Sequence, residues 1–396
     1  MIDQSVDTQQ KTISIQMGPS HPAMHGCVRL DCELDGEEIV ATDVTIGYLH
    51  RAFEKMAERN TYNKVIPYTD RLNYVSPLIN NVGYVMAVEK LLGVEVPPRC
   101  QYIRVIVSEI SRVCDHLTCL GAGAMELAAF TVFLYAIEAR DMLWEMIEYI
   151  CGARLTTTYT RVGGLTHDLP PEFENQMRQF FPKIRELVKD IRWLLEKNRI
   201  FTDRLRGIGI VSSETLISYG VTGPVARAAG IKYDVRKTHP YLVYDQLEFD
   251  VPIGEHGDNL DRFLVRVEEI EQSLRIVEQA FAKLPDGAVS IDDPRIFLPA
   301  KEKVYNTIEG MVHHFKLIID GPKTPPGEVY FPVEGANGEL GFYIVSDGAG
   351  KPYRCRVRAP CFPALSALPE MIRGHMIADV IATFGMLNII LGELDR

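Results

Sequence analysis

The sequence of 396 residues contains cysteines, but no two of them have the spacing of a metal site. Structural zinc and iron–sulfur sites usually take two cysteines separated by two residues. No such pair occurs here, so we expect this chain to bind no metal ion or iron–sulfur cluster by itself. The eight cysteines are Cys27, Cys32, Cys100, Cys114, Cys119, Cys151, Cys355 and Cys361.

Long apolar runs are also missing. A membrane-spanning helix needs about 20 apolar residues, and no run of even about 18 uncharged apolar residues is present. The nearest approach, Leu127 to Ile137, is too short and predicts a buried core helix. No signal peptide is recognisable, so we expect a cytosolic protein with reduced thiols.

Positively charged residues are in deficit. The 42 Lys and Arg residues stand against 53 Asp and Glu, which gives a formal net charge of −11 and disfavours a nucleic-acid binder. Hydrophobic residues make up 46% and mean hydropathy is −0.02, as in ordinary globular proteins. This composition argues against a disordered or an integral membrane protein.

Residues 12 to 47 alternate apolar and polar side chains in the way that is typical of half-buried strands. The alternation is interrupted by a loop at residues 18–26 and by the dipeptide Asp35-Gly36. Asp-Gly suits a type I′ hairpin turn. The pattern therefore predicts a three-stranded antiparallel sheet.

The middle of the chain carries three apolar stripes with helical spacing, within residues 103–117, 173–195 and 260–281. Pro182 should bend or restart the second helix. Long antiparallel helices predict a bundle. The charged residues that lie off the first stripe are Arg104, Glu109, Arg112 and Asp115.

The pattern changes again near Thr324. Short apolar runs now alternate with turn dipeptides such as Asn337-Gly338 and Asp347-Gly348, which predicts a β-meander. A last helix is expected around Ile372 to Phe384.

The predicted fold class is α+β, with a helical bundle core and small antiparallel β-sheets at the N-terminal and C-terminal ends. We expect residues 1–47 to form the N-terminal sheet and its loop, and residues 48–323 to form the bundle. Residues 324–396 should form the β-meander plus helix, packed on the bundle as one unit.

The loop at residues 18–26, GPSHPAMHG, contains two histidines between glycine and proline residues. One interpretation is a rigid turn whose His21 and His25 side chains cap strand ends. The other is a ligand-binding or proton-transfer loop, because histidine can donate a proton near neutral pH.

Two further segments are unusual. In PYTDRLNY, residues 67–74, a helix N-terminus at Thr69 or Asp70 would explain the polar residues, whereas Tyr74 can offer its hydroxyl to a carbonyl ligand. His116 and Glu126 lie in or beside the most apolar stretch. A buried carboxylate there needs a partner or stays protonated, so a satisfied core pair is an alternative to a functional role.

Together these segments resemble one family, the D subunit of bacterial NADH-quinone oxidoreductase (respiratory complex I), which is related to the large subunit of nickel–iron hydrogenases. The resemblance runs from about Ile13 to the end of the sequence and implies a hydrogenase-large-subunit-like fold. The motifs that carry it, in order, are GPSHPAMHG (18–26), GYLHRAFEK (47–55), PYTDRLNYVS (67–76), RVGGL (161–165), TGPVARAAG (222–230), HGDNLDRFLVR (256–266) and LGELDR (391–396).

The resemblance implies a quinone site between this chain and the iron–sulfur B subunit of the complex. His25 and Tyr74 correspond to the groups that hydrogen-bond the two quinone carbonyls, and Met24 is expected in the same site. Glu126 stands where the family usually has Asp, the carboxylate partner of that histidine. His25, Tyr74 and Glu126 are therefore the expected catalytic residues.

Other positions are expected to support this site. Arg71 resembles the arginine beside the terminal cluster of the B subunit, where a cation favours the reduced cluster. His21 and His116 are expected in supporting roles.

The function implied is reduction of a quinone, ubiquinone or menaquinone, coupled to proton translocation. NAD and the iron–sulfur clusters would lie in partner subunits, and the expected protein partners are the B, C and membrane H subunits. The chain would sit peripherally on the cytoplasmic side of the bacterial plasma membrane, with mainly indirect membrane contact and no nucleic acid.

Some positions depart from the related families. Asn73 and Ser76 occupy positions that resemble the first cysteine pair of hydrogenases, and the C-terminal pair is also missing, which argues against a metal-dependent hydrogenase. Thr156 stands where many relatives have histidine, two residues after Arg154, so coupling of the cluster potential to pH should be weak. This hints at a low-potential quinone such as menaquinone. The remaining alternative is a scaffold subunit whose quinone site has decayed.

Overall fold

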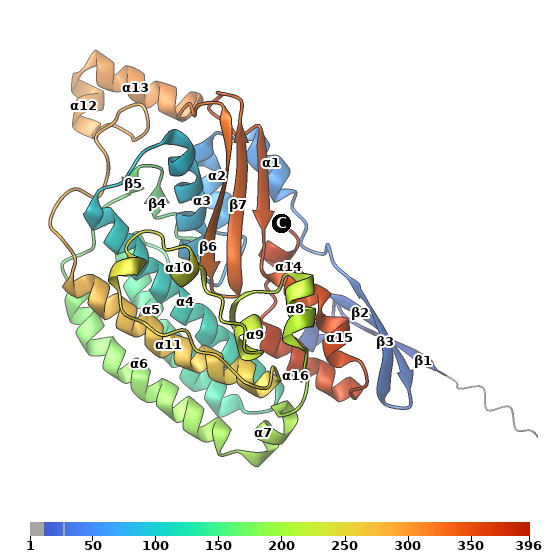
Figure 1. Ribbon diagram of the computed structural model, residues 1–396. Coiled ribbons are helices and arrows are strands. Elements are labelled where there is room, and N and C mark those ends of the chain that lie inside the picture. The colour runs from blue at the N-terminus through green and yellow to red at the C-terminus, as the bar shows by residue number, and fades with distance from the viewer. Residues whose placement is uncertain (1–11, 27) are drawn as a thin grey trace, which may run out of the picture.

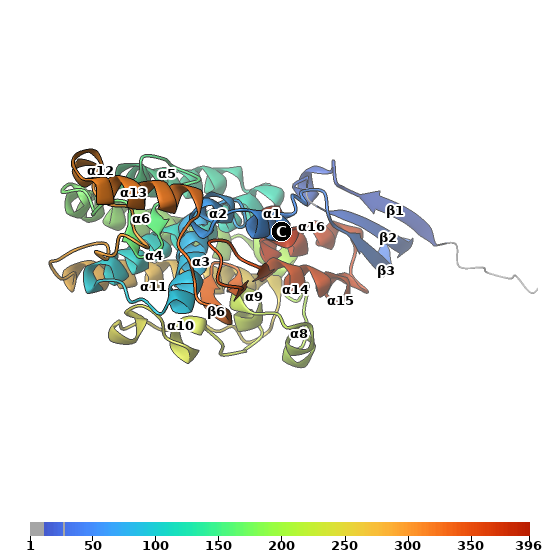
Figure 2. The ribbon, with the colours of Figure 1, turned by 90° about the horizontal axis from the view of Figure 1, so that it is seen from above.

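The computed structural model describes residues 12–26 and 28–396. Cys27 and the first part of the expected N-terminal domain, residues 1–11, lie outside the described residues. The predicted N-terminal sheet is confirmed, with antiparallel strand order β1-β2-β3. It projects from one side of the molecule (Figures 1 and 2). Its strands are β1 (Ile13–Met17), β2 (Arg29–Asp35) and β3 (Glu38–Thr45).

The hairpin between β2 and β3 differs from the predicted type I′ turn. Asp35 pairs with Glu38, so the two central residues are Gly36 and Glu37. Gly36 has a φ of 65°, whereas Glu37 does not enter the positive-φ region. A type I′ turn needs positive φ at both central residues, while glycine at the first alone fits type II′. The type I′ prediction is therefore wrong.

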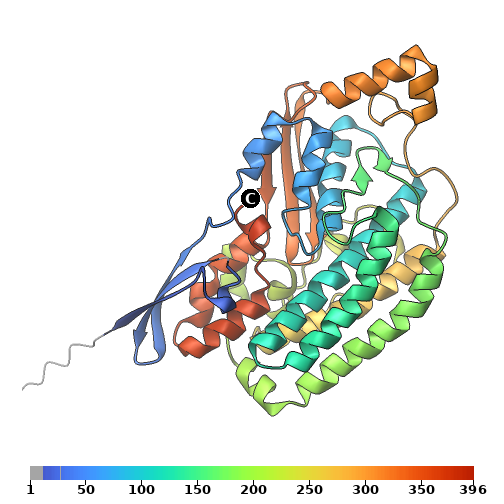
Figure 3. The same cartoon turned by 180° about the vertical axis from the view of Figure 1, so that it is seen from behind.

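The core is a helical bundle built around α4. This helix packs against α3, α5, α11 and α16 (Ile377–Leu387), so it is covered on nearly every side (Figures 1 and 3). The bundle helices are α3 (Pro77–Leu92), α4 (Pro98–Glu126), α5 (Phe130–Cys151), α6 (Phe173–Glu196) and α11 (Asn259–Ala282).

Shorter elements connect and cover these helices. A helical pair, α12 and α13, stands at the end of the molecule opposite the N-terminal sheet (Figure 1). The elements are α1 (Phe53–Arg59), α2 (Tyr62–Thr69), α7 (Arg199–Leu205), α8 (Ser213–Tyr219), α9 (Gly223–Ala228), α10 (Val235–Thr238), α12 (Lys301–Asn306), α13 (Ile308–Ile319), the strands β4 (Thr160–Arg161) and β5 (Gly164–Leu165), and the 3-10 turns η1 (Pro22–Met24) and η2 (Tyr244–Gln246).

Two expectations for the helices differ from the structure. Helix α6 does not restart at Pro182 but continues through it, because its apolar face is held against α5 and α11 despite the missing backbone hydrogen bond. The segment Leu127 to Ile137 is no buried helix, because the chain breaks between α4 and α5 there. Phe130 and Leu134 are 58% and 49% exposed, since α5 turns only its other face inward.

The C-terminal β-meander is present as an antiparallel sheet with order β6-β7-β8, packed on α3. The last helix expected around Ile372 to Phe384 corresponds to α16, which begins only at Ile377, and three further short helices lie beside it in the chain. Between α16 and the helix before it, Gly374 donates its N–H to Ile39 of β3, so the break attaches the C-terminal segment to the N-terminal sheet. The elements are β6 (Gly327–Gly335), β7 (Gly338–Ser346), β8 (Arg354–Arg358), α14 (Cys361–Ser366), α15 (Leu368–Ile372), α16 (Ile377–Leu387) and α17 (Leu391–Leu394).

The α+β class is thus confirmed, while the proposed domain boundaries stay a prediction. Burial of α4 extends to charged residues that lie off its apolar stripe.

Four of these charged residues are 0% exposed: Arg104, Glu109, Arg112 and Asp115. Each is paired inside the protein.

Arg227 of α9 connects several of these buried charges. Its Nε lies 2.7 Å from Glu269 Oε1 and its Nη1 lies 2.8 Å from Glu334 Oε1. The positive charge of Arg227 and the other partners outweigh burial and hold the pKa of Glu269 well below its usual range. The cation therefore favours ionised Glu269 in the interior, whereas burial and the nearby Asp234 raise the pKa of Glu334.

We predict that Arg227→Met destabilises the chain by about 3–5 kcal/mol, because it leaves two buried carboxylates without their cation. Urea unfolding of the purified chain measures this. Arg178→Met is the matched control, since Arg178 is 73% exposed and pairs with Glu174 at the surface. It should change the unfolding free energy by about 0–1 kcal/mol, and equal effects of both substitutions would contradict the prediction.

Candidate functional site

In the loop at residues 18–26, the two histidines differ in role: His21 has a structural contact, whereas His25 is exposed. His21 is the N-cap of η1, and its Nδ1 accepts a hydrogen bond from the N–H of Ala23 at 3.3 Å. His21 therefore caps a 3-10 turn and no strand end. Met24 is fully buried, whereas His25 follows in the left-handed region with φ 54° and carries an exposed side chain.

The structure brings His25 and Glu126 together. His25 Nε2 lies 2.5 Å from Glu126 Oε1, and the two side chains are 37% and 9% exposed. The His25 ring also packs on Phe384 of α16 in a T-shaped arrangement, with ring centroids 5.7 Å apart. The loop, the C-terminal end of α4 and α16 therefore meet at this histidine.

Tyr74 lies in the segment between α2 and α3 and is 38% exposed. Helix α2 ends at Thr69, with Asp70 as its C-cap, so the helix N-terminus expected at Thr69 or Asp70 is wrong. The side chain of Asn73 accepts hydrogen bonds from the N–H groups of Val75 and Ser76, at 3.1 and 3.3 Å. This turn leaves the ring of Tyr74 at the surface.

Asp115 fixes the segment that carries Tyr74, and the sequence alone gave it no role. Its Oδ2 accepts from Asn73 Nδ2 at 2.7 Å and from Ser76 Oγ at 2.8 Å, and its Oδ1 accepts from Asn388 Nδ2 at 2.6 Å. Asn73 and Ser76, compared above with hydrogenase cysteines, thus bind a carboxylate. The sequence offered one sign of this role of Asp115, namely its place beside His116 in a long helical stretch.

Arg71 is exposed in the same segment, and its backbone lies near the C-terminal residues. Its carbonyl oxygen accepts from Arg51 Nη2 at 2.7 Å, and that nitrogen lies 3.4 Å from the Gly392 oxygen. Asp395 accepts from the N–H groups of Gly47 and Leu49 at 2.9 and 2.7 Å. Three of the sequence motifs therefore converge here.

His116 lies elsewhere. It is 0% exposed, and its Nε2 lies 2.8 Å from Glu269 Oε2, so it forms no pair with Glu126. Burial lowers the pKa of His116. It belongs to the buried charge network of α4, and the structure does not place it at the surface with His25 and Tyr74.

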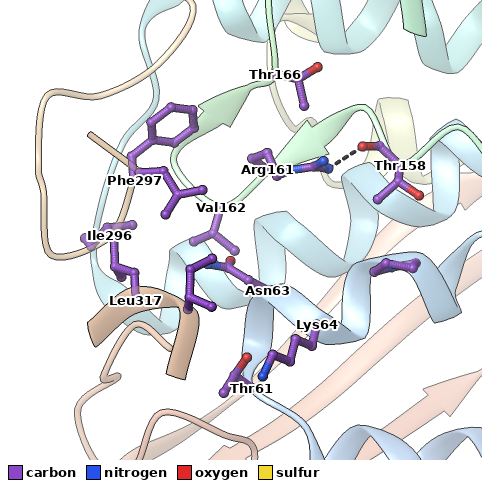
Figure 4. A pocket seen from close by; sticks show the side chains of 13 residues that line it. Thr61, Asn63, Lys64, Thr158, Arg161, Val162, Thr166, Ile296, Phe297 and Leu317 are labelled. Carbon is purple, nitrogen blue, oxygen red and sulfur yellow. Dashed lines mark hydrogen bonds between the residues drawn. The ribbon is translucent and has the colours of Figure 1, made fainter. Parts of the chain in front are cut away.

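The residues that line the cavity in Figure 4 include none of the predicted site residues. Its volume is about 460 Å³, and it lies between α2, the β4–β5 hairpin and α13. Lys64, Arg161, Val162 and Leu317 are among its lining residues, and Arg161 donates to the Thr158 carbonyl. A pocket shared between two chains need not appear as an enclosed cavity in one of them.

The described part of the chain offers neither a metal site nor a membrane span. Within residues 12–26 and 28–396, no group of three or more His, Cys, Asp and Glu side chains could hold a metal ion. Across the same two ranges, no helix is long and apolar enough to cross a membrane. Thr156, at the position where many relatives have histidine, has a left-handed backbone with φ 57°.

We predict that Asp115→Ala destabilises the chain by about 3 kcal/mol, because three buried donors lose their acceptor. Hydrogen exchange should show faster exchange in residues 71–76, and urea unfolding gives the free energy. Asp190→Ala, at an exposed position of α6, is the control and should shift the free energy by less than about 0.5 kcal/mol. Unchanged exchange in residues 71–76 would show that Asp115 does not fix the segment.

Glu393 of α17 is a buried acid near Asp115 and Cys361. Its Oε1 is buried and has no hydrogen-bond partner among the described residues. Burial raises the pKa of the Glu393 carboxyl to about 7. The folded chain therefore holds this proton at pH values where the unfolded chain has lost it.

The raised pKa gives a pH dependence with a definite sign. The contribution of Glu393 to stability is complete below its unfolded pKa and is lost as pH rises through about 7. We predict a loss of about 3 kcal/mol between about pH 4.5 and 8 from this group. Glu393→Gln should remove it, as measured by urea unfolding across pH, and an equal slope in both proteins would contradict the prediction.

Comparison with known proteins agrees with the sequence motifs. The family described as "Respiratory-chain NADH dehydrogenase, 49 Kd subunit" matches residues 126–396. A relative from Sorangium cellulosum, by name a D subunit of NADH-quinone oxidoreductase, is 55% identical over 392 residues, covering 99% of this chain and 97% of the relative. The D subunit of NADH-quinone oxidoreductase from Myxococcus xanthus is 52% identical, with coverage of 98% and 94%.

A third relative joins two subunits in one chain. The fused C/D subunit of NADH-quinone oxidoreductase from Bdellovibrio bacteriovorus is 50% identical over 386 residues, which cover 98% of this chain and 69% of the relative. The family match and the alignments that cover nearly the full length lead to the same conclusion. The chain belongs to the family of the respiratory-chain NADH dehydrogenase 49 kDa subunit, the D subunit of NADH-quinone oxidoreductase, and is a component of complex I.

Proposed function

We propose that this chain forms one side of a quinone-reduction pocket, whose other side is the iron–sulfur B subunit. His25 and Tyr74 would each hydrogen-bond one quinone carbonyl. The observation that carries the proposal is their common placement. Both side chains are exposed, while Met24 and Val75, their neighbours in the chain, are buried in the same hydrophobic cluster.

The chemistry of these groups fits the reaction. Reduction of a quinone to a quinol takes up two electrons and two protons, and histidine and tyrosine side chains can each donate one proton to an oxygen. Glu126 accepts a hydrogen bond from His25 when Nε2 carries its proton. Met24, whose side chain is buried, would contribute by anchoring the backbone next to His25.

Apolar surface beside Glu126 supports the same interpretation. Met125 is 42% exposed, Phe130 58% and Leu134 49%. Exposed aromatic and aliphatic side chains in one region mark interaction sites more often than isolated ones do. This surface suits the apolar part of a quinone or the membrane H subunit.

Arg71 supports the electron-transfer side of the proposal. Arg51 Nη2 donates to the carbonyl oxygen of Arg71, and burial together with the charge of Arg71 lowers the pKa of Arg51. Their positive potential would favour the reduced state of a cluster in the B subunit. Electrons from NADH would reach it through clusters in other subunits.

We further propose that the protonation of His25 and Glu126 is coupled to proton translocation by membrane subunits. The B, C and H subunits would be the partners, and the fused C/D protein of Bdellovibrio bacteriovorus makes the C subunit a plausible neighbour. The location would be the cytoplasmic side of the plasma membrane. Ubiquinone and menaquinone both fit, and Thr156 at the usual histidine position favours the lower-potential menaquinone.

A scaffold subunit with a decayed site is the competing function. A decayed site would not retain an exposed Tyr74 on a segment that Asp115 fixes by hydrogen bonds. Nor would it retain the pair of His25 and Glu126. Both arrangements are present here.

We predict that Tyr74→Phe in the assembled complex lowers quinone reduction by about 100-fold or more, because it removes one proton donor. Steady-state turnover with a soluble quinone measures this, and subunit content shows that assembly is intact. Tyr305→Phe is the control, since Tyr305 is 83% exposed on α12. Unchanged turnover in Tyr74→Phe would refute the proposed function.

A further inference from the structure

The carboxylate of Glu126 has two oxygens in different surroundings. Oε1 faces His25 Nε2 at 2.5 Å. Oε2 is buried and accepts no hydrogen bond from any described residue. The position of Oε2 must therefore be set by packing, since no donor holds it.

The atom that Oε2 packs against belongs to Gly385, in the last turn of α16. A Cβ added at this glycine would lie 2.2 Å from Glu126 Oε2 and 3.3 Å from its Cδ. Real atoms do not approach so closely, so the carboxylate occupies the space that any larger residue would need.

Backbone conformation does not explain the glycine. Gly385 lies inside a helix and its φ is not positive. Alanine is more favourable than glycine in such a position by about 1 kcal/mol. The structural reason for glycine here is therefore room for Glu126.

Helix α16 cannot simply withdraw to make room. Arg266 of α11 donates to the carbonyl oxygen of Met386 at 3.0 Å, and Asn388 donates to Asp115 at 2.6 Å. Phe384, which precedes the glycine, packs on the ring of His25. Because these contacts hold the end of α16, a methyl group at position 385 would displace the Glu126 side chain instead.

We infer that Gly385 is a positioning residue of the quinone site, whose missing side chain lets the Glu126 carboxylate reach His25 with Oε2 seated against α16. The inference rests on the proposed function, because the space beside Gly385 holds Glu126, the partner of the histidine that is proposed to donate a proton. Gly385 itself touches neither the quinone nor the reacting proton.

The test is Gly385→Ala in the complete complex. Displacing a catalytic group by about 1 Å can lower a rate by about 100-fold. We expect kcat for quinone reduction to fall about 10-fold to 100-fold, with a smaller change in KM, because the apolar surface at Met125 and Phe130 is unchanged. Melting of the complex, followed in parallel, reports its stability.

The double variant Gly385→Ala with Glu126→Asp separates positioning from a structural role. Aspartate is one methylene shorter, so its carboxylate withdraws from the new methyl group. We expect the double variant to be about 10-fold more active than Gly385→Ala alone. A structural role for Gly385 would give no such rescue, and failure of the rescue overturns the inference.

Gly123→Ala on α4 is the matched control. Its added Cβ would meet the flexible methyl end of Met386 at 2.3 Å, with no Glu126 atom in contact. We expect kcat to stay within about threefold of the wild type, and a loss as large as that of Gly385→Ala would overturn the inference.

The two proposals fail in different ways. If Tyr74→Phe abolishes quinone reduction while Gly385→Ala retains wild-type kcat, the positioning role is wrong and the quinone site stands. If Tyr74→Phe leaves quinone reduction unchanged, the proposed function is wrong, and the inference falls with it.

Discussion

Burial of the middle of α4 is the constraint on which the rest of the structure depends. A helix covered by α3, α5, α11 and α16 cannot leave a charged side chain in water, so each one needs a partner inside the protein. Glu109 is an example, because Arg112 and Arg236 outweigh burial and hold its pKa at about 2. Pairing of this kind connects α4 to helices, to the sheet and to loops that are distant in the sequence.

The same constraint shapes the candidate site. Asp115, on the buried helix, accepts hydrogen bonds from the segment that carries Tyr74 and from Asn388 after α16. Glu126, at the end of α4 where burial decreases, reaches the histidine loop instead. One helix thus positions both groups of the proposed quinone site, through the fully buried carboxylate of Asp115 in its middle and the carboxylate of Glu126, 9% exposed, at its end.

Several features could be predicted because they are local. Alternation of apolar residues sufficed for the N-terminal sheet, and helical spacing for the long helices. Errors arose where tertiary packing overrides local pattern. Pro182 stays within α6, Phe130 is exposed although it lies in an apolar run, and α16 begins only after Gly374, which pairs with β3.

The sequence by itself determined the fold class and, through its motifs, the family, and it predicted His25, Tyr74 and Glu126 as site residues. Only the tertiary structure decided which other residues support them. His116 pairs with Glu269, Asp115 holds the Tyr74 segment, and Gly385 makes room for Glu126. These contacts join residues far apart in the chain. No periodicity or propensity encodes such contacts, because they depend on where separate helices come to lie against one another.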